Sequence, residues 1–65
     1  MSYIIKTVID RNNYFLRIFQ GKNKAYSEWT GLIQNATKYK DQKEAVDVAY
    51  AETTLECDII PYIHD

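Results

Sequence analysis

Hydrophobic and polar residues alternate along the first third of this chain in the manner of two paired strands. Residues 3–9 and residues 14–20 are rich in β-branched and aromatic side chains, which favours a strand in each stretch. The polar run 10–13 separates them and contains Asn12 and Asn13. Since asparagine tolerates positive φ, either of these residues is expected to form the turn of an antiparallel hairpin.

The middle of the chain continues the pattern with shorter elements. Residues 21–24 are polar and predict a second turn, and residues 25–30, which include Tyr26 and Trp29, predict a short third strand. Residues 31–40 predict a single helical turn followed by a short extended piece through Tyr39, because Gly31 and Thr37 interrupt the helical spacing.

The spacing of polar and apolar residues changes to a helical period after residue 40. Asp41 and Glu44 stand three residues apart, as in a capping box, and predict the start of a helix that ends near Thr53. Its apolar stripe contains the small residues Ala45 and Ala49, which would let the helix lie close to a sheet.

The last pattern, over residues 55–63, again alternates as a strand. Leu55, Cys57 and Ile59 are expected to face the core, and Pro61, which has no N–H to donate, is expected at a sheet edge. The predicted fold class is α+β: a small antiparallel sheet of three to four strands with one helix packed on one face, in the order ββ(β)αβ. We expect residues 1–65 to form a single small domain.

Composition narrows the function classes that the chain can serve. A single cysteine, Cys57, excludes an intramolecular disulfide, and together with His64 it is too few ligands for a zinc site. Trp29 is expected to be largely buried in so small a core. No signal peptide and no membrane-spanning run is expected, which favours an intracellular protein.

Catalytic motifs are not expected either. Cys57 is interpreted as a small core residue, His64 as part of a frayed tail, and the two glycines are too far apart to form a phosphate-binding loop. The chain is therefore predicted to be no enzyme and to use no cofactor or metal.

Charge is distributed unevenly along the chain. Residues 1–43 contain eight basic and three acidic residues, a net charge of +5, whereas residues 44–65 contain six acidic residues and no Lys or Arg, a net charge of −6. Such asymmetry bears on partners more than on fold.

The acidic third suggests an anionic surface for a partner protein with a basic surface. The residues proposed for it are Glu44, Asp47, Glu52, Glu56 and Asp58. Oppositely charged halves also allow a homodimer. A purely solubilising role for the acidic third remains open.

The basic part offers an alternative from another class of function. Basic and aromatic residues are placed together on one predicted hairpin, as in proteins that bind single-stranded nucleic acid. The residues proposed for this face are Arg11, Arg17, Lys22, Lys24 and Tyr26. A pI of about 5.7 makes nucleic acid the less favoured partner.

The order of elements and several landmarks resemble short ββαβ proteins encoded by phages and prophages of low-GC Gram-positive bacteria. The landmarks are the polar turn at 10–13, Glu28-Trp29-Thr30, the spacing of Ile33, Ala36 and Tyr39, and residues 41–45 leading to Val48-Ala49. The resemblance implies a protein of the bacterial cytoplasm that inhibits or modulates a host factor by covering its surface, with an anti-CRISPR role as one form.

Overall fold

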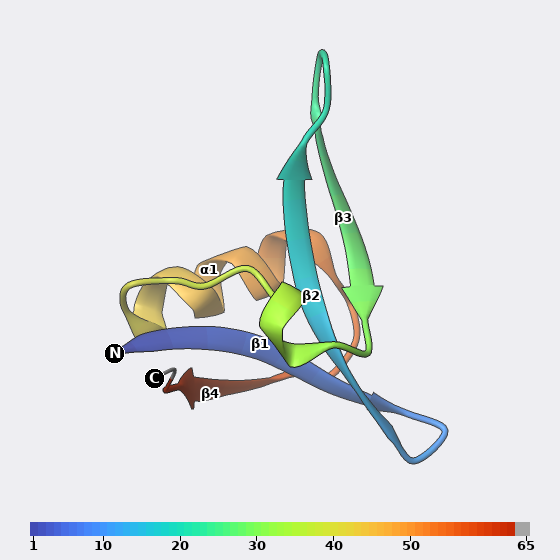
Figure 1. Cartoon of the computed structure of the whole chain (residues 1–65), viewed down its shortest axis with the longest axis vertical. Coiled ribbons are helices and arrows are strands. Elements are labelled where there is room, and N and C mark those ends of the chain that lie inside the picture. Colours follow the sequence, from blue (N-terminus) through green and yellow to red (C-terminus); the bar gives the residue numbers. More distant parts are fainter. Residues whose placement is uncertain (64–65) are drawn as a thin grey trace.

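The computed structural model describes residues 1–63, which form one four-stranded antiparallel sheet with a helix on one face (Figure 1). The sheet order is β3-β2-β1-β4. The elements are β1 (Ser2–Ile9), β2 (Asn12–Gln20), β3 (Ala25–Thr30), the 3₁₀ turn η1 (Ile33–Asn35), α1 (Gln42–Glu52) and β4 (Asp58–Tyr62). This architecture confirms the predicted fold class and the predicted order of elements.

The β1–β2 turn differs from the sequence-based expectation. Asp10 and Arg11, not the two asparagines, have positive φ, at 52° and 70°. Asn12 and Asn13 instead belong to β2 and pair with the end of β1. The loop is thus only two residues long, and positive φ at both of its positions gives a backbone twist that matches the flanking strands.

Strands β1 and β2 pair over only part of their length and then diverge (Figure 1). Residues 36–39, which we term the bridging segment, fill the space between them. Tyr39 exchanges two backbone hydrogen bonds of 2.8 Å with Tyr3 of β1, and Thr37 bonds to Leu16 and Ile18 of β2. The extended piece predicted through Tyr39 is therefore present, and it closes the centre of the sheet.

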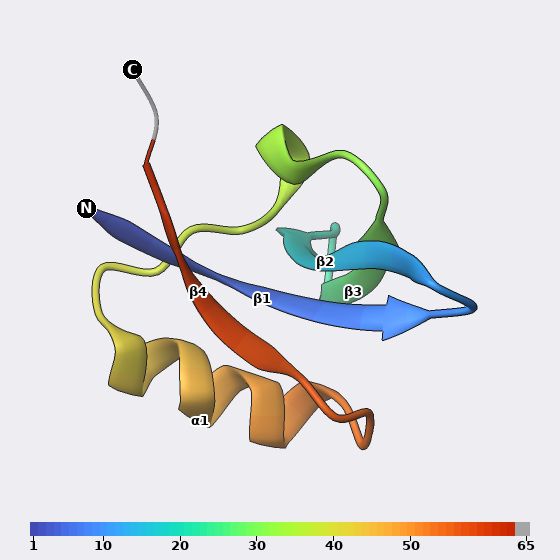
Figure 2. The same ribbon diagram turned by 90° about the horizontal axis from the view of Figure 1, so that it is seen from below.

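The two faces of the sheet carry separate hydrophobic clusters. On the helix side, Ile5, Leu16 and Tyr39 are buried together with Ala45 of α1. On the other side, Ala36 of the bridging segment is buried against Ile4 of β1 and Phe15 of β2. Figure 2 shows α1 along one face of β1 and β4 and η1 on the opposite side.

The helix begins as predicted. The Asp41 side chain accepts a hydrogen bond of 2.8 Å from the Glu44 backbone N–H, and the helix ends with Thr53 at its C-cap. The described residues show no reciprocal bond from the Glu44 side chain to Asp41. Ala45 is fully buried, so its small side chain lets α1 lie close to the sheet.

The last strand is shorter than expected. β4 begins at Asp58, and Leu55 is 44% exposed rather than part of the core. Residues 53–57 form a loop because the Thr53 hydroxyl accepts from the Leu55 N–H and the buried Thr7 hydroxyl donates to the Glu56 carbonyl. Of the residues 55–63 predicted as a strand, only Asp58–Tyr62 therefore form one.

Trp29 and Pro61 lie on the two edge strands of the sheet, β3 and β4. Pro61 lies on the edge strand β4, as predicted, opposite Tyr3. Trp29 packs against the helix-side cluster, and most of its surface is covered, as expected, although it does not belong to the fully buried core. The reason is its place on β3, the other edge strand, where solvent reaches one side of the ring.

Candidate interaction site

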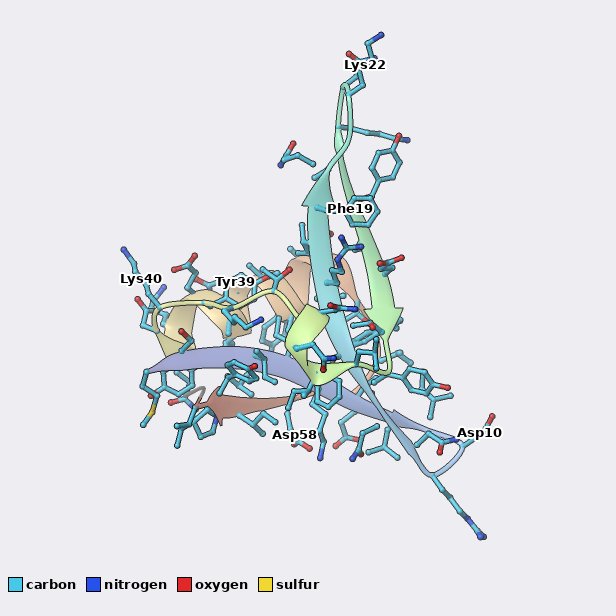
Figure 3. The ribbon with its side chains drawn as sticks, in the orientation of Figure 1. Asp10, Phe19, Lys22, Tyr39, Lys40 and Asp58 are labelled. Carbon is cyan, nitrogen blue, oxygen red and sulfur yellow. The ribbon has the colours of Figure 1, made fainter. Side chains whose placement is uncertain are left out.

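The ends of β2 and β3 that lie beyond the bridging segment project from the domain as a two-stranded arm (Figure 1). We define the arm as residues 17–28, with Lys22 at its tip (Figure 3). Residues that pair across an antiparallel ladder point to the same face. The arm face, defined as the side away from α1, therefore carries Arg17, Phe19, Lys24, Tyr26 and Glu28.

The side chains of the arm face contact one another in a continuous row. Phe19 and Tyr26 are stacked, with ring centroids 5.7 Å apart and planes 24° apart. The Arg17 guanidinium lies 4.7 Å from the Phe19 centroid, and the Lys24 ammonium lies 5.2 Å from the Tyr26 centroid. Arg17 also forms an ion pair with Glu28. Cation–π contacts of this kind contribute about 0.5–1 kcal/mol each at exposed sites.

Gly21 makes room for the aromatic pair. A Cβ at this position would lie 2.1 Å and 2.7 Å from two ring carbons of Tyr26, so any larger residue would displace that ring. The tyrosine therefore has three neighbours that fix it: the bare Gly21 backbone, the Phe19 ring and Lys24. Both rings nevertheless remain accessible, Phe19 at 37% and Tyr26 at 44%.

The basic residues selected from the sequence are brought together only in part. Three of these basic residues lie on the arm together with Tyr26, and they are Arg17, Lys22 and Lys24. Arg11 lies in the β1–β2 turn, next to Asp10, at the end of β2 remote from Lys22 (Figure 3). Sequence reasoning did not include Phe19 or Glu28 in this face; the alternation of Phe19 with Arg17 along β2 was a usable signal for Phe19 alone.

The acidic residues selected from the sequence do not share one face. Glu44, Asp47 and Glu52 lie on α1, and Asp47 forms an ion pair of 3.1 Å with Lys43. Glu56 lies in the 53–57 loop. Asp58 pairs with Lys6 and points to the sheet face away from α1.

Tyr39 and Cys57, which belong to or pack against the helix-side cluster, both have a raised pKa. Burial raises the pKa of Tyr39, and the charges of Glu44 and Glu52 raise it further; the buried hydroxyl has no hydrogen-bond partner among residues 1–63. Burial, followed by the charge of Asp58, also raises the pKa of Cys57. A raised pKa lowers the thiolate fraction, so it reduces the nucleophilicity of this cysteine.

Cys57 lines a groove of about 460 Å³ between the end of α1, the 53–57 loop and β4. Its Sγ donates to the Leu55 carbonyl at 3.4 Å, and its side chain packs against the helix-side cluster. Tyr50, at 85% exposure, and Leu55 form the outer part of this groove. The contacts of Cys57 are those of a structural residue.

Among residues 1–63 there is no group of three or more His, Cys, Asp or Glu side chains that could hold a metal ion. His64 lies outside the described residues. Within the same part of the chain, no helix has the length and hydrophobicity needed to cross a membrane.

Comparison with protein-family models, with curated proteins and with solved structures gives no match to this chain.

Proposed function

We propose that this chain is a non-enzymatic binding module that uses the arm face to cover a surface of another protein. The observation that carries the proposal is the exposed Phe19–Tyr26 pair, held in place between Arg17 and Lys24 on a projecting arm. In keeping with the resemblance to small phage proteins, the partner is a host protein of a bacterial cell and the effect is inhibition or modulation.

The composition of the arm face is that of a binding hot spot. Tyrosine and arginine are enriched among the residues that contribute most to protein interfaces, and charged residues at the rim act mainly on association rate. Because the rings and the cations already contact one another, little side-chain freedom is lost when a partner binds. The partner surface that fits has an apolar centre for the two rings and acidic groups opposite Lys22 and Lys24.

Nucleic acid fits the same face less well. The charge of Arg17 is already paired with Glu28, which leaves Lys22 and Lys24 as the arm cations without a carboxylate partner in the described part of the chain. The affinity for a nucleic-acid strand rises with the number of phosphates that basic side chains neutralise, so two lysines contribute only weak affinity. A partner protein with a basic surface is also less favoured. The five acidic residues that would bind it are divided between α1, the 53–57 loop and the sheet face away from α1.

The proposal is tested by affinity capture with the whole chain from a nuclease-treated bacterial lysate, followed by titration of the purified partner. Phe19→Thr combined with Tyr26→Thr removes both rings and keeps residues that favour strands. Tyr50→Ala is the matched control, because it removes an aromatic side chain that is 85% exposed on α1. We expect the double variant to weaken binding by at least about tenfold and the control to leave it unchanged.

Two results would overturn the proposal. One is equal loss of binding in the arm variant and in the Tyr50 variant. The other is binding of the purified chain to single-stranded DNA or RNA, measured by fluorescence anisotropy, that falls steeply as salt rises and depends on Phe19 and Tyr26. The latter result would identify a nucleic-acid-binding regulator instead.

A further inference from the structure

The two edges of the sheet differ in how they are protected against pairing with another strand. On β4, the backbone N–H and carbonyl of Tyr3 bond to Tyr39, so the pair of Tyr3 with Pro61 is not hydrogen-bonded and the Pro61 nitrogen points outward. Proline at such a position removes a donor from the open edge without cost to the ladder. The β4 edge is thereby blocked near its C-terminal end.

The β3 edge has no comparable protection. Residues 25–30 contain no proline, no lysine and no glycine, and Ala25–Glu28 are exposed. The N–H and carbonyl of Ile18 bond to the Thr37 hydroxyl, on the side away from β3. Ile18 and Ser27 are therefore a non-hydrogen-bonded pair, and by alternation the backbone N–H and carbonyl groups of Ser27 and Ala25 point to the open edge.

The sequence around this edge is complementary to itself. Lys24 and Glu28 flank Tyr26 at equal spacing, and all three lie on the arm face, Lys24 through its contact with the Tyr26 ring. If two copies of β3 pair antiparallel with Tyr26 opposite Tyr26, then Lys24, the residue immediately before β3, lies opposite Glu28 of the second copy. In the same register, Ala25 and Ser27 of opposite copies exchange the outward backbone bonds, and their small side chains allow close approach.

We infer that the partner of the β3 edge is a second copy of this chain, joined across a two-fold axis at Tyr26 to form one continuous eight-stranded sheet. A two-fold interface requires the same patch on both subunits, and the pattern Lys24–Tyr26–Glu28 supplies opposite charges at both ends of it. The dimer places two arm faces side by side and continues the Phe19–Tyr26 stack into the second copy.

This inference deepens the proposed function, because two adjacent arm faces give a larger contact area for a partner protein. It does not depend on that function, since the dimer can be measured with the purified chain alone. The interface is tested by sedimentation equilibrium over concentrations from about 1 μM to about 1 mM. We expect a mass of twice 7.7 kDa at the upper end.

Charge swaps test the register. Lys24→Glu alone and Glu28→Lys alone each place like charges opposite one another twice, so each variant should dimerise on the order of tenfold more weakly. A mixture of these two variants should form a heterodimer more strongly than either variant dimerises alone, because both pairs between the copies are then complementary. Lys22→Glu is the control: it makes the same change of charge at the arm tip, outside the paired region, and should have little effect.

Amide exchange supplies an independent readout. The amides of Ala25 and Ser27 should become protected as concentration rises, whereas those of Tyr26 and Glu28, which face β2, should be protected throughout. A chain that stays monomeric at the highest concentration overturns the inference. So does a dimer that forms equally well in the Lys24 variant and in the Lys22 control, or one in which Ala25 and Ser27 remain unprotected.

Discussion

Tyr39 combines a buried side chain with a hydroxyl that has no partner among the described residues, which makes Tyr39→Phe a direct test of the core beneath α1. The residue is 7% exposed, and the hydroxyl is buried within the helix-side cluster. Leaving a buried polar group unpaired costs about 1–3 kcal/mol. We therefore expect the phenylalanine variant to be more stable than wild type by about 1 kcal/mol at pH 7.

The assay is thermal and urea unfolding followed by circular dichroism. For a domain of this size, a gain of about 1 kcal/mol raises Tm by roughly 4–8 °C. Tyr50→Phe is the matched control, because it removes a hydroxyl from a residue that is 85% exposed. Its stability should equal that of wild type. A Tyr39→Phe variant that melts below wild type would refute the reasoning, because the hydroxyl would then make a stabilising interaction.

The same residue predicts a pH dependence whose sign is fixed by the direction of its pKa shift. Burial, Glu44 and Glu52 raise the pKa of Tyr39 above its ordinary value of 10.0. The unfolded chain therefore loses this proton first as pH rises, and the folded state loses stability above about pH 10. The phenylalanine variant lacks this contribution, so its advantage over wild type should increase through the alkaline range. An advantage that shrinks above about pH 10 would contradict the stated direction.

Two further substitutions test contacts in the segments that come before and after α1. Asp41→Ala removes the N-cap that accepts from the Glu44 N–H, so it should lower the free energy of unfolding by about 0.5–2 kcal/mol in urea titration, and Asp41→Asn should retain most of the stability. Thr7→Val leaves the Glu56 carbonyl without the 2.9 Å hydrogen bond from the Thr7 hydroxyl and should lower the free energy of unfolding by about 1–3 kcal/mol. Thr7→Ser keeps the hydroxyl and should lower it less. Equal stability of the valine variant and wild type would count against this bond.

Much of the fold could be predicted from the sequence because local patterns and tertiary packing agree there. The β-branched runs form strands, and the Asp41 cap begins the helix where the hydrophobic period changes. The β1–β2 turn was mispredicted because the position of a turn depends on pairing. Shortening the loop to Asp10 and Arg11 adds ladder pairs for Asn12 and Asn13, and this pairing outweighs the preference of asparagine for turns.

The interaction site was harder to predict, because it depends on neighbours across strands. The register that places Phe19 beside Tyr26, and Arg17 beside Glu28, cannot be read from the spacing of these residues alone. Likewise, most of the acidic residues lie in the last third of the sequence, but they do not share one surface. Side chains alternate between the two faces along β4, so Asp58 lies on the face away from α1. Sequence gives the number of charges, whereas only pairing decides which of them share a surface.

The bridging segment has a consequence for the order of folding events. The two hairpins are local and can form quickly, but Thr37 reaches Ile18 across 19 residues, and Tyr39 reaches Tyr3 from still farther along the chain. Contacts of such separation form late, because the entropy of closing the loop must be overcome first. The segment bonds to both diverging strands. Its insertion therefore joins the arm to β1, β4 and α1 in one cooperative unit. Substitutions at Thr37 should therefore act mainly on the unfolding rate, whereas substitutions in the hairpin turns should act on the folding rate.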